Sequence, residues 1–202
     1  VPFTLISADA RACGMGELGT GIADNLNAMY WNPAGLGFQE NTQVALNFSR
    51  WLPQFNTDLY YSYGAFGQYV EELDGFIGAN FILMNLGEFT RTSETGVALG
   101  KFRYNEFSFG VSYGTLISDD IAAGVGLKYI QSNLAPVGGP GTTGAGPGIS
   151  GAFDLGILWR PLKLDVGGLD LSDKVALGFN LQNVGPKVTY LQQSDPLPTT
   201  LR

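Results

Sequence analysis

From Thr42 onward, large apolar residues recur at every second position over several stretches of the chain. Successive side chains of a β-strand point to opposite faces, so this period predicts strands with one apolar face and one small or polar face. The clearest stretch spans residues 104–115. There, Phe107, Phe109, Val111 and Tyr113 alternate with Ser108, Gly110, Ser112 and Gly114. The main part of the chain is therefore predicted to be an all-β structure of antiparallel strands.

Seven such stretches and the beginning of an eighth are present. They predict strands at residues 42–50, 59–66, 74–87, 104–115, 121–129, 152–160 and 175–182, with the eighth beginning in residues 197–202. Residues 42–202 are predicted to form a single barrel domain. Residues 1–41 are predicted to be an N-terminal segment with a short helix, acting as a plug. Asp24 or Asn25 is expected to cap this helix, and Pro33 and Gly35 to end it.

Composition separates a membrane barrel from a soluble sheet protein. Only 14% of the residues are charged, against roughly 25% in soluble globular domains. No stretch approaches the roughly 20 apolar residues of a membrane-spanning helix, and the mean hydropathy of +0.08 fits a closed barrel of alternating strands. A soluble sandwich or lipocalin-like barrel gives the same alternation with its apolar face turned inward. The scarcity of charges on the second face favours a transmembrane β-barrel.

The links between the predicted strands alternate in length, which predicts an orientation. The third link, residues 88–103, and the fifth, residues 133–149, are the long ones, and residues 136–148 are rich in Gly and Pro, as in an exposed loop. Outer-membrane barrels have short periplasmic turns and longer outer loops, so the N-terminus is predicted to be periplasmic. Seven strands would leave two unpaired edges in lipid, and we therefore expect the natural protein to continue beyond Arg202.

The sequence offers little for catalysis or for nucleic acid. The net charge is −7, and the chain lacks the basic patch that binding of nucleic acid requires. There is no His and only one cysteine, Cys13, so neither a His-based catalytic group nor a cluster of zinc ligands is expected. The carboxylate pairs at residues 71–72 and 119–120 are adjacent, which is typical of solvated turns. We predict a non-enzymatic protein without catalytic residues, cofactor or metal.

Two runs near the N-terminus resemble a known family. Residues 7–16 read SADARACGMG and residues 27–36 read NAMYWNPAGL. Together with residues 128–130, 183–188 and 197–202, they resemble the PorV/PorQ family of outer-membrane β-barrel proteins, which have a FadL-like architecture. The resemblance implies a barrel of 14 strands, of which this chain would be about the N-terminal half. It also implies a place in the outer membrane of a Gram-negative-type bacterium, in contact with outer-membrane lipid.

The resemblance further implies a role in the type IX protein secretion system. Such a barrel binds cargo with a C-terminal signal domain at a large translocon barrel and shuttles it to the surface attachment machinery. The cargo-binding residues remain unassigned, and a PorV-like and a PorQ-like role both remain open. The NPAG element also occurs in FadL-like relatives, so a conduit for hydrophobic small molecules is an alternative. A structural surface or assembly barrel is a second alternative.

The resemblance assigns a structural role to part of the N-terminal motif. Six residues are expected to fix the plug or the base of the barrel rather than to touch a ligand: Asn27, Tyr30, Trp31, Asn32, Pro33 and Gly35.

Overall fold

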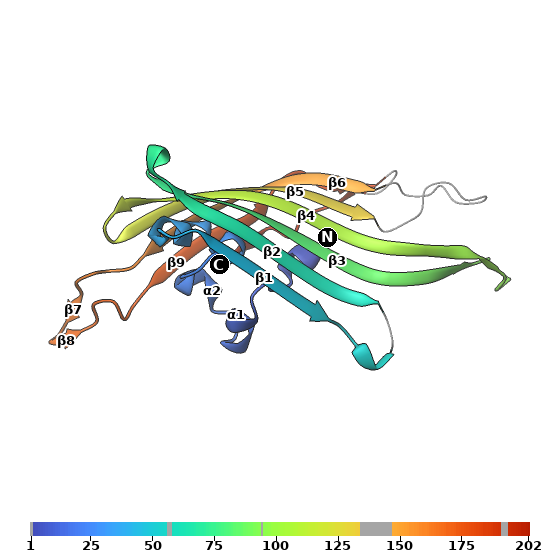
Figure 1. Cartoon of the computed structure of the whole chain (residues 1–202), viewed down its shortest axis with the longest axis horizontal. Coiled ribbons are helices and arrows are strands. Elements are labelled where there is room, and N and C mark those ends of the chain that lie inside the picture. The colour runs from blue at the N-terminus through green and yellow to red at the C-terminus, as the bar shows by residue number, and fades with distance from the viewer. Residues whose placement is uncertain (1, 56–57, 94, 134–146, 191–193) are drawn as a thin grey trace.

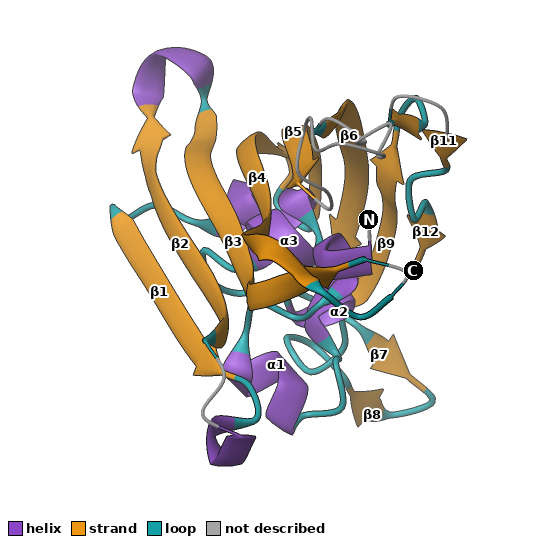
Figure 2. Ribbon diagram, turned by 90° about the vertical axis from the view of Figure 1, so that its right-hand side faces the viewer, coloured by secondary structure: helices purple, strands orange, loops and turns teal. Residues whose placement is uncertain are grey.

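The computed structural model describes residues 2–55, 58–93, 95–133, 147–190 and 194–202. Within these residues the chain forms a ten-stranded antiparallel sheet that curves around an N-terminal helical segment (Figures 1 and 2). The described sheet does not close on itself, because β1 forms one edge while β11 and β12 lie at the other end. No helix among the described residues is long and apolar enough to cross a membrane.

The long strands form a meander in which each strand pairs with its predecessor. They are β1 (Gln43–Arg50), β2 (Leu59–Val70), β3 (Gly75–Thr92), β4 (Ala98–Ser118), β5 (Ile121–Asn133), β6 (Gly148–Trp159) and β9 (Leu177–Val184). Three short strands complete the sheet: β10 (Val188–Thr189) pairs with β6 and with β11 (Ser194–Asp195), and β12 (Thr200–Leu201) pairs with β9. The seven predicted strands are therefore confirmed, and β12 lies where the eighth was expected.

Helical turns fill the N-terminal segment and two of the links. The segment contains η1 (Pro2–Leu5), α1 (Ala10–Gly14), α2 (Gly19–Ile22), α3 (Ala28–Trp31) and η2 (Pro33–Phe38). Outside it lie η3 (Pro53–Phe55), η4 (Glu71–Leu73) and a separate two-stranded hairpin of β7 (Asp165–Val166) and β8 (Leu169–Asp170). The helix predicted near Asp24 or Asn25 is the single turn α3, and the residue preceding it is Asn27. Neither predicted residue directly precedes α3. Asp24 pairs with Arg11, whereas the Asn25 side chain accepts a hydrogen bond from the Asn27 backbone N–H and so caps the turn that leads into the helix.

The two faces of the sheet differ sharply in polarity. The face turned away from the helices exposes large apolar side chains on every long strand. Among them are Val44, Leu46, Phe48, Phe66, Phe81, Phe109, Val111, Val125, Leu127, Phe153, Leu155, Ile157, Leu177 and Phe179. The inner face carries glycines and buried polar residues, including Asn80, Glu106, Ser108, Ser112, Asp154 and Asn180. The apolar face is thus the outer one, the reverse of a soluble sandwich.

Large apolar side chains also lie on the inner face. Tyr61 and Tyr63 of β2 and Ile82 of β3 are buried there. The Tyr61 hydroxyl donates a hydrogen bond to the Ile6 carbonyl at 3.1 Å. Because the N-terminal segment covers the inner face of β2, large side chains find an apolar neighbour there.

The predicted third link is also wrong in its limits. Residues 88–103 were expected to be a loop, but β3 runs on to Thr92 and β4 begins at Ala98. These extensions pair with each other beyond a β-bulge at Asn85 and Gly87, where Gly87 has a φ of 83°. The polar residues of this stretch lie on a projecting hairpin instead of a loop. Of the predicted fifth link, residues 134–146 lie outside the described residues.

Candidate functional site

The N-terminal segment rests on the inner face of the sheet, close to the end where the short turns lie (Figure 1). This seat is formed by β4, β5, β6 and β9, which face η2 and α2. Three glycines on neighbouring strands lie directly across from one another there, since Gly114 pairs with Gly124 and Gly124 with Gly156. They form a row of positions without side chains across the wall.

The glycine row lets the segment approach the sheet backbone directly. A Cβ on Gly124 would lie 2.2 Å from the Pro33 carbonyl carbon, and one on Gly156 would lie 2.0 Å from the Asn32 Oδ1 atom. A Cβ on Gly114 would lie 2.6 Å from the Pro33 carbonyl oxygen. Such distances are far below van der Waals contact, so a side chain at any of these positions would push the segment away from the wall.

Asn32 connects the segment to the wall through its side chain. Its Nδ2 donates to the carbonyls of Thr20 at 3.0 Å and Ile157 at 3.1 Å, while its Oδ1 accepts from the Ala34 N–H at 3.1 Å. The residue is fully buried. It ends α3 and caps the start of η2, with Pro33 at the first position of that helix. This one side chain therefore makes hydrogen bonds to α2, to η2 and to a carbonyl of strand β6.

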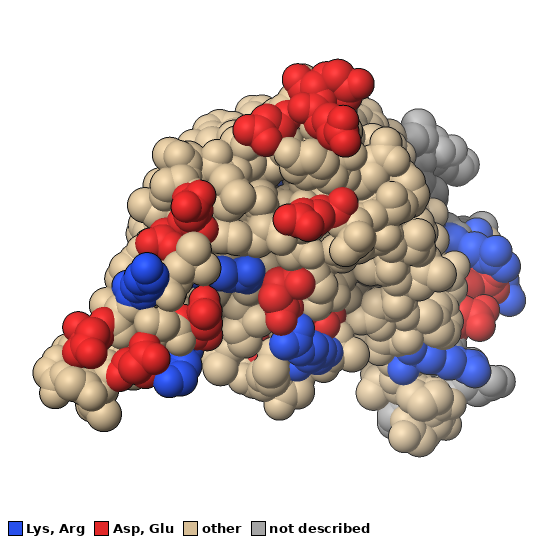
Figure 3. Space-filling view, turned by 60° about the vertical axis from the view of Figure 1, so that its left-hand side comes forward, with Lys and Arg blue, Asp and Glu red and all other residues tan. Residues whose placement is uncertain are grey.

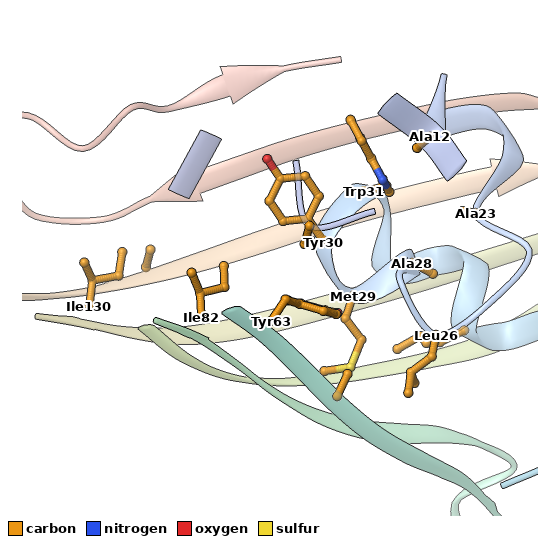
Figure 4. Close-up of a cluster of buried hydrophobic side chains, with 14 of the residues drawn as sticks. Ala12, Ala23, Leu26, Ala28, Met29, Tyr30, Trp31, Tyr63, Ile82 and Ile130 are labelled. Atoms are coloured by element: carbon orange, nitrogen blue, oxygen red, sulfur yellow. The ribbon is translucent and has the colours of Figure 1, made fainter. Parts of the chain in front are cut away.

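The wall holds the two preceding residues by their backbone. Asn180 Nδ2 donates to the Trp31 carbonyl at 2.6 Å, and Gln182 Nε2 donates to the Tyr30 carbonyl. The rings of Tyr30 and Trp31 meet edge to face, with centroids 5.0 Å apart, within the buried cluster of Figure 4. Burial raises the pKa of the Tyr30 phenol, which therefore stays protonated at neutral pH.

The remaining motif positions are fixed by close packing and by local turns. A Cβ on Gly35 would lie 2.2 Å from the Ala23 carbonyl oxygen, so glycine is required there too. The Asn27 carbonyl accepts hydrogen bonds from the N–H groups of Tyr30 and Trp31 at the start of α3. The structure thus brings Tyr30, Trp31, Asn32, Pro33 and Gly35 together at the seat, with Asn27 one turn before them.

Several wall residues of the seat were not found by sequence reasoning. The Arg160 guanidinium donates to the Ile22 carbonyl and lies 4.7 Å from the Phe38 ring centre, so it contacts the ends of α2 and η2. Asn47 Nδ2 donates to the Ala8 carbonyl at 2.7 Å. With Asn180 and Gln182, these are amide or guanidinium groups on strands or at strand ends. The sequence signal that could have identified these residues is a polar side chain on the face of a strand that otherwise carries small residues.

The segment also carries its own ion pair. The Arg11 guanidinium binds both carboxylate oxygens of Asp24, at 2.6 and 2.9 Å. This bidentate contact lowers the pKa of Asp24 below its ordinary value. Both side chains are substantially exposed, so the pair ties α1 to the turn after α2 without being part of the seat.

A second polar group lies further along the inner wall. Lys128 Nζ is 2.6 Å from Asp154 Oδ2 and donates to Asn183 Oδ1 at 3.1 Å. The Asn183 backbone N–H donates to Asp154 Oδ1 at 2.8 Å, and Asn183 has a φ of 56°. The group links β5, β6 and β9 where β9 leaves the ladder. The buried carboxylate is paired with an ammonium group and accepts a main-chain hydrogen bond, which is the geometry of a structural contact.

The acidic residue pairs considered for catalysis lie in turns. Glu71 and Glu72 belong to η4, and Asp119 and Asp120 form the turn between β4 and β5. Figure 3 looks toward this end of the molecule and shows acidic side chains spread over it. Among the residues that the structure describes, no group of three or more His, Cys, Asp or Glu side chains is placed to hold a metal ion.

Comparison with known protein families identifies a match that covers the chain. The family described as "Type IX secretion system protein PorV" matches residues 1–202. No curated protein matches the chain.

Proposed function

Because the chain belongs to the PorV family of type IX secretion system proteins, we propose that it forms the wall of an outer-membrane β-barrel that binds secreted cargo. The family match over residues 1–202 is the observation that carries the secretion role. The cargo would carry a C-terminal signal domain, be received at a large translocon barrel, and be delivered to the surface attachment machinery. The barrel itself would supply binding and no chemistry.

The polarity of the wall supports a place in the membrane. On β4 the outward apolar band runs from Phe107 to Ile117. At about 3.3 Å per residue this is roughly 33 Å along the strand, and a tilt of about 40° reduces it to about 25 Å, the height of the apolar band of outer-membrane barrels. An asparagine row marks its far end, since Asn105 pairs with both Asn85 and Asn133 across three strands.

The edges of the described sheet support a barrel. An open sheet in lipid would leave unpaired N–H and C=O groups along β1 and β12, which is prohibitively unfavourable in hydrocarbon. We propose that further strands pair with these edges and close a 14-stranded, FadL-like barrel. In this barrel the short-turn end, beside which the N-terminal segment lies, faces the periplasm.

The seat supports binding over conduction. The six motif residues, Asn27, Tyr30, Trp31, Asn32, Pro33 and Gly35, would fix the N-terminal segment to the wall as a permanent plug. A conduit for hydrophobic molecules needs an apolar path along the lumen. The described inner face mixes apolar residues such as Ile82 and Ile130 with Asn80, Glu106 and Asp154, so it does not favour the conduit.

The test of the proposed function is purification of the full-length protein from outer membranes in mild detergent, with mass spectrometry of what accompanies it. We expect a very large barrel and proteins that share a C-terminal signal domain. Recovery of a monomer with a bound hydrophobic molecule would replace the cargo role with the conduit. Recovery of large arrays of the protein alone would favour a structural surface barrel.

The role proposed for the plug motif has its own test. Asn32→Ala removes three hydrogen bonds and leaves the carbonyls of Thr20 and Ile157 buried without this donor, and we expect a loss of about 2–4 kcal/mol in unfolding free energy. Limited proteolysis should then cleave the N-terminal segment faster than in the unchanged protein. Asn27→Ala is the matched comparison, because Asn27 acts at the start of α3 through its backbone carbonyl, which alanine keeps. Equal protease resistance of Asn32→Ala and the unchanged protein would refute the anchoring role.

A further inference from the structure

The outer face of the sheet carries a groove where β9 leaves β6. The pairing of β6 with β9 ends at Phe153 and Val184, and β10 rejoins β6 at Ile149. Between these points the chain passes so close to β6 that a Cβ on Gly185 would lie 2.1 Å from the Gly151 carbonyl oxygen. The ladder of β6 is therefore interrupted opposite Gly151.

Gly151 forms the floor of this groove. Side chains point alternately to the two faces along β6, so Gly151 lies on the outer face with Ile149 and Phe153. A Cβ there would make an ordinary contact with the Lys128 carbonyl oxygen, at 3.6 Å, and would otherwise enter open space. The missing side chain leaves a hollow of about 570 Å³ between the side chains of its neighbours. A position without a side chain thus interrupts a continuous apolar surface.

Apolar side chains from four strands surround the hollow. Those that line it are Phe109, Val111, Leu127, Tyr129, Phe153 and Val184. The first five are between 39% and 67% exposed, so they present surface to an occupant. The Tyr129 hydroxyl donates to Gln131 Oε1 at 2.9 Å. Lys128 also borders the groove, but its Nζ pairs with Asp154 on the inner face. The groove therefore favours an occupant without polar groups.

The groove lies within the apolar band of the wall, in the half nearer the asparagine row. Phe109, Tyr129 and Gly151 are in register across β4, β5 and β6. Phe109 follows Asn105 by four residues, which is roughly 13 Å along the strand and about 10 Å in depth at a tilt of about 40°. The apolar band of such barrels is about 25 Å high. An occupant at this level would lie in the leaflet on the side of the long links.

The surroundings of the groove favour a lipid over a protein partner. Protein interfaces enclose their apolar centre in a polar rim that supplies hydrogen bonds. Here the neighbouring outward side chains of β5 and β6 are apolar as well, since Val125, Ile149 and Leu155 are each exposed. A hydrocarbon chain needs no such rim. A groove also surrounds it on more sides than a flat wall does, which increases the dispersion contacts.

We propose that this groove holds one acyl chain of a membrane lipid at a fixed place on the wall. The inference rests on the proposed position of the outer face in the membrane. It goes beyond general contact with the bilayer, because the lipid at Gly151 stays bound when the lipid around the rest of the wall is exchanged.

The test uses the full-length protein in phosphatidylethanolamine vesicles that contain a phospholipid with a photoreactive diazirine in its acyl chain. Irradiation in the vesicles should label Tyr129 and Phe153 in the groove and also Leu46, which is 80% exposed on β1. After transfer to mild detergent, which replaces loosely held lipid, irradiation should label the two groove residues at least tenfold more than Leu46.

A variant fills the groove from its floor. Gly151→Phe should lower the labelling of Tyr129 in detergent at least tenfold, and native mass spectrometry should count one lipid fewer on the protein. Ala123→Phe adds a similar ring to the outer face of β5, outside the groove. It should change the labelling by less than twofold and leave the lipid count unchanged.

Three results would overturn the inference and are distinguishable from one another. Equal labelling of Tyr129 and Leu46 in detergent would mean that the groove holds lipid no more tightly than the flat wall, and the membrane position would survive. Absence of label from both residues in vesicles would remove the membrane position and the inference with it. A co-purified protein that Gly151→Phe releases, without retained lipid, would replace the lipid with a protein partner. The labelling of the unchanged protein does not depend on any variant folding.

Discussion

At the scale of single residues, the N-terminal segment contacts the sheet at positions that lack a side chain. The row of Gly114, Gly124 and Gly156 admits the Asn32 side chain and the Pro33 backbone to the wall. The amides of Asn180 and Gln182 then hold the carbonyls of the two residues before them. Glycine is required at these three positions because atoms of the N-terminal segment approach so closely. Backbone conformation is not the reason, since none of the three has a positive φ.

The glycine row can be tested within one strand. Gly156→Ala places a Cβ 2.0 Å from Asn32 Oδ1, whereas Gly151→Ala, also on β6, finds only the Lys128 carbonyl oxygen, at 3.6 Å. We expect Gly156→Ala to lower the unfolding free energy by about 1–3 kcal/mol or more through overpacking. Gly151→Ala should remain within about 0.5 kcal/mol. Thermal unfolding in detergent measures both, and equal stability would contradict the packing seen at the seat.

The ion pair of the N-terminal segment predicts a dependence on pH. Arg11 lowers the folded-state pKa of Asp24, so the stabilisation is complete above the ordinary pKa of about 4 and is lost as the pH falls through the lowered value. Because the pair is exposed, the effect should be small. Proteolysis of the segment by an acid-active protease should accelerate below this range. Asp24→Asn should show less of this acceleration, and an identical pH profile would exclude the pair as its cause.

Sequence reasoning could identify only some of the residues of the seat. The resemblance pointed to the motif positions from Asn27 to Gly35, but not to their partners on the wall. Asn180 lies 149 residues from Trp31, and nothing near it in sequence shows which backbone its amide will meet. Arg160 likewise acts on carbonyl and ring atoms of a distant segment. Such partners depend on the completed register of the sheet.

At the scale of elements, alternation located the strands but not all their limits. The seven long strands follow the period of two, which is a local property of each stretch. Sequence analysis assigned the extensions of β3 and β4 to a link between strands. The bulge at Gly87 and the pairing of residues 88–92 with residues 98–103 are set by contacts between strands, which composition does not reveal. In β2 the N-terminal helical segment determines which face of the strand Tyr61 and Tyr63 occupy.

The link between β5, β6 and β9 can be tested through its charges. Lys128→Met leaves the carboxylate of Asp154, which is 1% exposed, without its ammonium partner. We expect a loss of about 3–5 kcal/mol. The double variant Lys128→Met with Asp154→Asn should lose much less than the sum of the single changes. Urea unfolding in lipid vesicles measures the cycle, and simple additivity would show that the two groups do not interact.

At the scale of the whole molecule, the wall is apolar outside and polar inside, with a plug bound to the polar side. Leu127 is 67% exposed at the middle of β5. If this face meets lipid, Leu127→Arg should lower the stability in vesicles by about 2–4 kcal/mol. Thr90→Arg, opposite Lys101 on the projecting hairpin of β3 and β4, should have little effect. An outer face that tolerates arginine at residue 127 would rule out its contact with the bilayer core.

The seat of the N-terminal segment also determines the order in which the molecule can fold. The segment precedes every strand in the sequence, but its hydrogen bonds reach Ile157, 125 residues after Asn32, and Asn180, 149 residues after Trp31. Contacts of such long range form late and slow folding. The segment therefore cannot complete its hydrogen bonds to the wall until β9 has joined the sheet, and it must be kept from misassociation until then.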